Sequence, residues 1–237
     1  IYYRRIQWSG TTASWADSSS QQLTNWGSAP EYYDFDDATS TLPLAPEGSS
    51  CSYSIELYRD GSRLQMATIR NGYLWTCQYV GLSGTGGSYS GTDTGAAVDR
   101  SGIQWWQLQL NSSGTPLTYV RSGMVYDSAS SNPWWYYMPS LAVNWQNQAV
   151  LGFSGSSANN YIGAFYTWVM GNGATLGSNV VLTNGSSCAA IWWGDYSFTT
   201  VDPMDNQTIW TIQGFASNEG GPPYCWSDWI ASVKPGP

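Results

Sequence analysis

Three stretches of this chain repeat one pattern: a short apolar strand, a turn and a second apolar strand. They are residues 63–78 around the turn Asn71-Gly72, residues 139–154 around a turn at 145–148, and residues 195–213 around a turn at 202–207. A strand-turn-strand unit that recurs at roughly 55 to 75 residues predicts the blades of a β-propeller. Because such a unit cannot bury its apolar faces alone, each copy needs a neighbouring sheet.

The rest of the chain extends this all-β interpretation. Gly is abundant, helix formers are sparse, and apolar runs are short and bounded by turn residues. We expect two four-stranded blades, a three-stranded blade and the outer half of a further blade. The expected strands are 63–69, 73–79, 103–110 and 115–121, then 140–143, 149–154, 161–169 and 179–183, then 196–201, 208–215 and 226–233, with 1–8 and 13–16 forming the outer half-blade.

These strands predict one partial propeller domain over residues 1–237, with residues 25–62 as an irregular acidic connection. About three and a half four-stranded blades make half of a six- to eight-bladed ring. A half-ring leaves strand edges open, which proteins avoid, so we expect another polypeptide or a second copy to complete it. A smaller closed barrel or a sandwich built from one chain is the alternative fold.

The charge of the chain excludes several classes of partner. Charged residues make up 10% of the chain, the net charge is −8, and Lys234 is the sole lysine. An acidic protein of this kind lacks the basic patch that nucleic acids and anionic membranes require. No apolar run approaches the ~18 residues that span a bilayer, so we expect no contact with a membrane.

The four cysteines are Cys51, Cys77, Cys188 and Cys225, and the chain has no histidine. No pair has zinc-knuckle spacing, so two disulfides formed in an oxidising, extracellular compartment are expected. The pairing Cys51–Cys77 with Cys188–Cys225 is favoured because each bond closes a loop within one blade. Four buried free thiols are the alternative.

Three Asn-x-Ser/Thr sequons begin at Asn111, Asn184 and Asn206. Each falls in a polar turn between expected strands, where an N-linked glycan is tolerated, so a glycoprotein is expected. Sequons also arise by chance in a chain so rich in Asn, Ser and Thr.

Several longer motifs carry a family resemblance. They are Arg-Asn-Gly-Tyr-Leu-Trp within 60–76, Tyr-Met-Pro-Ser within 136–143 with 151–154, Trp-Gly-Asp-Tyr-Ser followed by Val-Asp-Pro within 193–203, and Trp-Ser-Asp-Trp-Ile-Ala within 226–232. In these motifs the chain resembles a group of secreted, mostly bacterial, sialidase-like (BNR-type) β-propeller proteins. The resemblance implies a propeller fold and secretion, and it implies no particular reaction. The sialidase aspartate box is absent, and residues 31–59 do not align.

In a propeller the innermost strands line the axial channel, and loops at one rim form the usual binding face. The residues at the entrances to these strands are Asp60, Arg63, Tyr136, Tyr137, Trp193, Asp195 and Tyr196. Aromatic faces stack on sugar rings while Asp and Arg bind hydroxyls or a carboxylate, so this set predicts glycan binding. The alternative is that Trp193-Gly194-Asp195 is a turn whose carboxylate accepts backbone N–H bonds.

Asp60 and Asp195 are also the carboxylate pair that we nominate for catalysis, because glycoside hydrolysis needs two carboxylates held about 5 to 9 Å apart. Without histidine, the usual nucleophilic triads are excluded. Asp34, Asp36 and Asp37 resemble a weak calcium loop, but a solvated acidic loop is the favoured interpretation because the glycine and the terminal Glu of an EF-hand are missing. No other metal or cofactor is expected.

Adjacent tryptophans occur at 105–106, 134–135 and 192–193. Neighbours in a strand face opposite ways, so one ring of each pair is expected to pack inward and the other to be open to glycan or a partner chain, while inter-blade core is the favoured role for most of the fifteen tryptophans. Together these features predict a secreted β-propeller module that binds glycan or another extracellular polymer through aromatic rim residues. A carbohydrate-active hydrolase or lyase and a structural subunit of an extracellular assembly are the alternative functions.

Overall fold

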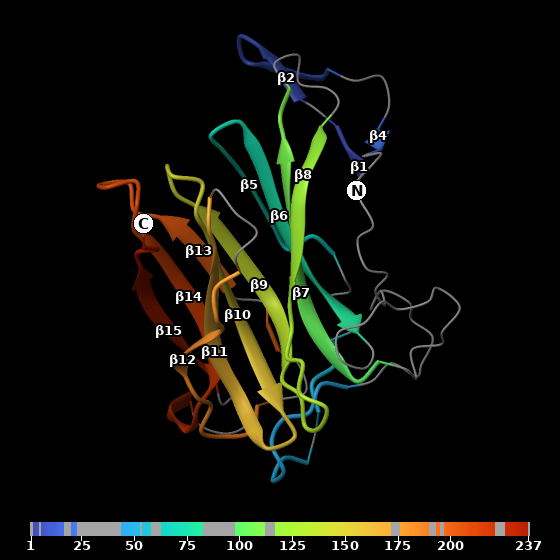
Figure 1. Ribbon diagram of the computed structural model, residues 1–237, viewed down its shortest axis with the longest axis vertical. Helices are drawn as coiled ribbons and strands as arrows, with labels where there is room; N and C mark the ends of the chain where they lie inside the picture. The colour runs from blue at the N-terminus through green and yellow to red at the C-terminus, as the bar shows by residue number, and fades with distance from the viewer. Residues whose placement is uncertain are drawn as a thin grey trace.

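The computed structural model describes residues 2–4, 6–16, 20–22, 44–52, 54–57, 63–82, 98–111, 117–171, 176–189, 193–194, 197–220 and 226–236. Apart from one short 3₁₀ turn, η3 (Asn218–Gly220), the regular elements of these residues are β-strands (Figure 1). The all-β class expected from the sequence is therefore confirmed.

Three antiparallel sheets make up the body of the molecule, and each follows the chain as a meander. The first sheet has β5 (Met66–Arg70), β6 (Tyr73–Leu82), β7 (Arg100–Gln109) and β8 (Thr118–Val125). The second sheet has β9 (Trp135–Val143), β10 (Ala149–Ser157), β11 (Asn160–Val169) and β12 (Val180–Thr183). The third sheet has β13 (Ser197–Val201), β14 (Ile209–Ala216) and β15 (Trp226–Val233). Each repeat of the sequence pattern is thus the first hairpin of a sheet.

The N-terminal strands form two small separate sheets. β1 (Tyr2–Tyr3) pairs with β4 (Gln21–Gln22), and β2 (Ile6–Ser9) pairs with β3 (Thr12–Trp15). The expected strands are therefore present, and within the described residues the β2–β3 hairpin pairs with no other strand.

The second sheet lies between the other two. β9 contacts β6 and β7 of the first sheet, while β10 and β11 contact β14 of the third. The opening strands β5, β9 and β13 also contact one another in that order, so equivalent strands lie side by side (Figure 1). Within the described residues these sheets do not close into a ring.

An aromatic and aliphatic core fills the space between the first and second sheets. The rings of Trp75 and Trp105 stack with centroids 5.8 Å apart, and Phe153 stacks on Phe165 at 5.9 Å. Trp106 points to the other side of β7, where it packs with Leu108 and Leu117, and both Trp105 and Trp106 are buried. The expectation of one exposed ring is therefore wrong for this pair, because both faces of β7 are covered.

The interface between the second and third sheets is different, because hydroxyls and an amide fill much of it. The Gln213 amide nitrogen donates to Ser140 Oγ at 3.0 Å and to Thr211 Oγ1 at 2.8 Å. Ser197 Oγ lies 2.7 Å from the Gln213 amide oxygen, and Thr199 Oγ1 lies 2.7 Å from Ser140 Oγ. A satisfied network of this kind stabilises a buried polar interface and fixes its register.

Parts of the expected acidic connection belong to the core. Ala45, Ile55 and Leu57 are buried, and Ala45 and Ile55 form an isolated antiparallel bridge. Gly48 N–H donates to the Ser157 carbonyl at 2.9 Å, which ties this segment to the end of β10. Residues 44–52 and 54–57 of the expected irregular connection therefore pack against the sheets.

The disulfide pairing differs from the favoured one. Cys51 bonds to Cys188, across a sequence separation of 137 residues, and Cys77 is a free buried thiol. Cys77 lies inside β6 opposite Trp105, on the core face, where Cys51 cannot reach it. The expected bond between Cys188 and Cys225 is also wrong, because Cys188 is bonded to Cys51. Cys225 itself lies outside the described residues.

We expect Gly152→Ala to destabilise the protein, because a Cβ at this position would lie 2.2 Å from both Gln213 Nε2 and Thr211 Oγ1. The network must then shift or break, at a cost of about 1–3 kcal/mol in the free energy of unfolding. Urea denaturation measures this cost. Gly236→Ala is the matched control, since nothing lies within 4 Å of its Cβ position. Equal stability of both variants would contradict the packing described above.

We also expect Cys51→Ser to lower the free energy of unfolding by about 2–5 kcal/mol, because the bond that it removes closes a very long loop in the unfolded chain. Non-reducing peptide mapping should find the peptides of Cys51 and Cys188 linked, and Cys77 should resist alkylation until the protein unfolds. A peptide pair joining Cys51 to Cys77 would refute this connectivity.

Candidate functional site

The residues predicted to form a binding rim fall into three groups. Asp60, Asp195 and Tyr196 lie outside the described residues, so the nominated carboxylate pair stays a prediction. Arg63 lies on the segment that leads into β5, while Tyr136 and Tyr137 lie within β9. Trp193 lies before β13.

The two tyrosines are part of the core. The Tyr136 ring meets Phe153 edge-on at 5.1 Å and Phe165 at 5.6 Å, and burial raises the pKa of its hydroxyl to about 12. Tyr137 is fully buried, and its hydroxyl donates to Ser156 Oγ at 2.8 Å. Neither ring presents a face to solvent, so stacking on a sugar is not their role in this structure.

Trp193 packs at the edge of the same core. Its indole N–H donates to Ser154 Oγ at 3.1 Å, and Ser154 Oγ donates in turn to the Gly214 carbonyl at 2.9 Å. Its ring is half-buried against Gly214. These contacts join the entrance of β13 to the second sheet and leave part of the indole exposed.

The sequons and the calcium prediction can be placed in part. Asn184 and Asn206 are exposed, whereas Asn111 is half-buried and donates its amide to Thr118 Oγ1 at 3.5 Å. Asp34, Asp36 and Asp37 lie outside the described residues. Among the residues that the structure does describe, no group of three or more His, Cys, Asp or Glu side chains gathers into a metal site.

A different set of residues comes together where the first hairpins of the three sheets turn. We call this surface the turn rim; it comprises Arg70, Asn71, Trp145, Gln146, Asn147, Asn206 and Gln207. The three turns lie at the same end of the molecule because β5, β9 and β13 run side by side (Figure 1).

Left-handed asparagines shape each of these turns. Asn71, Asn147 and Asn206 have φ of 51°, 60° and 55°. Asparagine tolerates this region better than other non-glycine residues, and Asn71-Gly72 is a standard two-residue hairpin turn. The sequence therefore sets the geometry of the rim locally, one turn at a time.

Hydrogen bonds then join the turns to one another. The Asn71 amide donates to Asn147 Oδ1 at 2.8 Å and to the Trp145 carbonyl at 3.2 Å. The Trp145 N–H donates to the Asn206 carbonyl at 3.1 Å, and the Arg70 guanidinium donates to Asn206 Oδ1 at 2.9 Å. All three turns are thus held in one arrangement.

Trp145 is held by its backbone while its side chain is 55% exposed. An exposed indole on a fixed backbone offers a flat apolar surface at little entropic cost, and the neighbouring amides of Gln146, Asn147 and Gln207 can exchange hydrogen bonds with hydroxyls. This combination suits a flat polyhydroxylated ligand better than a compact ion.

The sequence analysis missed this rim although its signals were visible. Asn71-Gly72, the turn at 145–148 and the turn at 202–207 were each recognised as turns. These turns occupy equivalent positions in the three repeats, and that equivalence predicts that they lie close together in the folded chain. We looked for binding residues at the opposite ends of the same strands.

The carboxylates beside the rim, Asp202 and Asp205, accept hydrogen bonds from groups of the third turn and from β14. Asp202 accepts bonds from the Met204 N–H at 2.8 Å and from the Trp210 indole at 2.9 Å. The Thr208 hydroxyl and the backbone N–H groups of Gln207 and Thr208 hold the pKa of Asp205 at about 2. A carboxylate that stays ionised in this way is a poor general acid.

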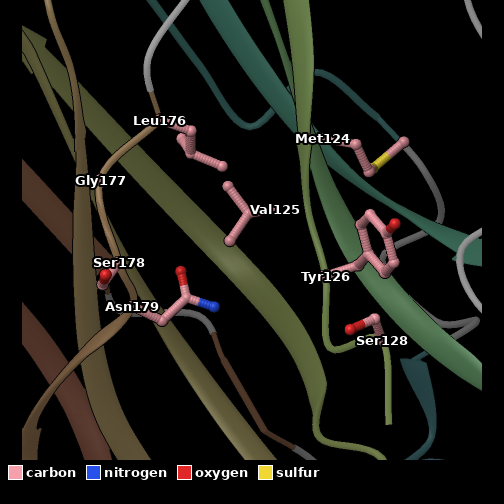
Figure 2. A pocket seen from close by; sticks show the side chains of 8 residues that line it. All are labelled: Met124, Val125, Tyr126, Ser128, Leu176, Gly177, Ser178 and Asn179. Atoms are coloured by element: carbon pink, nitrogen blue, oxygen red, sulfur yellow. The ribbon is translucent and has the colours of Figure 1, made fainter. Parts of the chain in front are cut away.

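A groove of about 340 Å³ lies at the outer edges of the first two sheets, between the segments 124–128 and 176–179. Figure 2 shows Tyr126 and Ser128 on one wall and Ser178 and Asn179 on the other. Asn179 also hydrogen-bonds Tyr136, which fixes one side of the groove to the core. The lining is uncharged: Met124, Val125 and Leu176 are apolar, and the half-buried Tyr126 is its aromatic residue.

Two arginines are structural. Arg100 is buried, pairs with Asp99 at 2.8 Å and donates to the carbonyls of Asp127 and Ala129. Arg121 lies over Trp75, with 5.3 Å from its guanidinium carbon to the ring centroid, and donates to the Met170 carbonyl at 3.0 Å. Both join strands and loops, so neither offers a cation to an anionic ligand.

Glu47 is a buried carboxyl next to the disulfide. One oxygen accepts a hydrogen bond from the Ala189 N–H, and among the described residues the other has no hydrogen-bond partner. Burial raises the pKa of Glu47 from 4.5 to about 7, although the Ala189 hydrogen bond lowers it in part. Glu47 therefore couples the stability of this corner to pH.

No family model matches the chain, and neither a curated protein nor a solved structure matches it. Across the part of the chain that the structure describes, no helix has the length and apolar character to cross a membrane.

We expect stability to fall as pH rises from 4.5 to about 7, because over this window the unfolded chain releases the Glu47 proton while the folded protein keeps it. Glu47→Gln should remove that decline, because its amide stays neutral across the whole range, so the free energy of unfolding of the variant should rise relative to that of the wild type between pH 4.5 and pH 8. Denaturation at a series of pH values tests this. Parallel pH profiles for the two proteins would show that Glu47 is not the titrating group.

Proposed function

We propose that this protein is a secreted module that binds neutral glycan chains on the turn rim. The main support for this proposal is Trp145. Its indole is exposed, hydrogen bonds hold its backbone, and amide side chains surround it. Sugar rings stack on such a face while their hydroxyls bond to the amides. The preformed geometry lowers the entropic cost of binding.

The charge of the protein favours a neutral polymer. A net charge of −8 repels acidic polysaccharides over the distances at which they approach. Arg70 is the nearest cation on the rim, and it already donates to Asn206. Polysaccharides of neutral hexoses or pentoses therefore fit better than uronates or sulfated chains.

We also propose that the three sheets are consecutive blades of a propeller. The support is their shared meander, their equivalent first hairpins and the contacts of β5 with β9 and of β9 with β13. In that arrangement the turn rim lies near the axis, at one mouth of the channel. The resemblance to secreted sialidase-like propellers and the Cys51–Cys188 disulfide both support an extracellular location.

The test is affinity electrophoresis in gels that contain soluble neutral polysaccharides such as xylan, glucomannan or hydroxyethyl cellulose. We expect wild-type protein to be retarded in at least one gel and Trp145→Ala to bind about tenfold more weakly or worse, as when an aromatic hot spot is truncated. The protein should be made without N-glycans, because a glycan on Asn206 would stand beside Trp145.

Trp229→Ala is the matched control, since this exposed tryptophan lies on β15 and not on the rim. It should bind like the wild type, and thermal unfolding should show both variants folded. Retention of Trp145→Ala equal to that of the wild type would reject the rim as the binding surface. An absence of retardation for the wild type in every gel would reject neutral glycan binding itself.

A further inference from the structure

The third sheet has one buried face and one apolar face that is open to solvent. Strand register places Phe198, Ile212 and Ile230 side by side, with Trp210 on the same face one pair further along. Phe198 is 54% exposed, Trp210 40% and Ile230 61%. Thr199, Thr211 and Gln213 project to the opposite face, which packs on the second sheet. We call the open side the outer face.

The outer face is as large as the largest apolar patches that monomers expose. Phe198, Trp210, Trp226 and Ile230 together expose roughly 400 Å² if each side chain carries the area typical of large apolar residues. A patch of about 300–600 Å² is the largest that typical monomers expose, and it usually marks an interaction site. In the other two sheets the exposed large apolar side chains are single ones, such as Ile69, Val120 and Val181, whereas here they are contiguous, which favours a binding partner on this face.

The N-terminal β2–β3 hairpin presents a matching surface. Its register pairs Ile6 with Trp15 and Trp8 with Ala13, so these four side chains share one face. Ile6 is 57% exposed, Trp8 70% and Trp15 56%. Gln7, Ser9, Thr12 and Ser14 form the other, polar face. A two-stranded hairpin is marginally stable by itself, so burial of the apolar face would stabilise it.

Charge is complementary between the two surfaces. The hairpin carries Arg4, whose guanidinium lies over the Trp15 ring at 4.2 Å from its centroid. The outer face carries Asp228, which the register places opposite Gly214 and next to Trp226. A cation beside one apolar patch and a carboxylate beside the other orient the two surfaces as they meet.

One copy cannot join these two surfaces in the arrangement that the structure shows. The hairpin lies at the top of the view in Figure 1, beyond the first sheet, while β15 lies at the far left edge of the third sheet. Within the described residues β15 also pairs with β14 alone, so one long edge of the third sheet is open. A second copy can satisfy both surfaces at once.

We propose that two copies of this chain exchange their N-terminal hairpins, so that the apolar face of each β2–β3 hairpin packs on the outer face of the partner's third sheet. The two contacts are equivalent, which gives a closed two-fold dimer. Each contact covers Ile6, Trp8 and Trp15 on one side and Phe198, Trp210 and Ile230 on the other. The turn rim takes no part in either contact.

Light scattering after gel filtration tests this proposal on the full chain. We expect wild-type protein at twice the 26.0 kDa of one chain. Trp8→Ser with Trp15→Ser should give a monomer, and so should Phe198→Ser with Ile230→Ser. Trp145→Ser is the matched control, because it removes an exposed tryptophan from the rim and should leave the dimer intact.

A mixture of the two double variants distinguishes hairpin exchange from other dimers. Their heterodimer keeps one intact contact, since the sheet variant supplies a native hairpin and the hairpin variant supplies a native outer face. We therefore expect mixing to restore part of the dimer. A monomeric wild type, or a hairpin variant that stays dimeric by packing two outer faces together, would overturn the proposal. If the Phe198→Ser, Ile230→Ser variant fails to fold, the oligomeric state of the Trp8→Ser, Trp15→Ser variant alone tests the proposal.

Discussion

Strands β9 and β10 of the second sheet have no solvent-facing side, and the arrangement of the molecule follows from this. All nine residues of β9 and all nine of β10 are buried. A strand that alternates its side chains between two covered faces needs a sheet on each side. The first and third sheets supply those covers, so the order of the three sheets along the chain is also their order in space.

The two interfaces of the second sheet are chemically different. One is mainly apolar and the other is mainly hydrogen-bonded. Between the first and second sheets, stacked and edge-on aromatic rings such as Trp75, Phe153 and Phe165 provide a large buried apolar area. Between the second and third, Ser140, Gln213 and their neighbours form a hydrogen-bonded network that tolerates little displacement. Gly152 lets the strands approach closely enough for that network to form. The apolar interface buries the larger set of hydrophobic side chains, and the hydrogen-bonded interface constrains how the second and third sheets align.

Local patterns predicted the strands and turns well, since alternation, β-branched residues and Asn-Gly turns act over a few neighbours. Contacts between distant segments were predicted poorly. The Cys51–Cys188 bond joins residues 137 apart, and proximity in sequence favoured Cys77 instead. Tyr136 and Tyr137 resembled exposed rim aromatics because nothing in their immediate sequence shows that β9 is covered on both faces. Trp106 was misjudged for the same reason, because burial of the second face of β7 depends on residues far away in the chain.

The same reasoning connects the turn rim to the sheet packing. Side-by-side first strands bring their hairpin turns together, and the turns are then close enough for Asn71 to bond to the Trp145 carbonyl and for Trp145 to bond to the Asn206 carbonyl. A binding surface at this position needs no dedicated loop, because each sheet contributes a turn of two to seven residues that its own sequence already specifies. Specificity can change by substitution at the turn tips while the buried network beneath stays the same. Since the strands below Trp145 are among the most completely buried in the molecule, its indole rests on the part of the fold least able to move, which is the condition that a stacking platform requires.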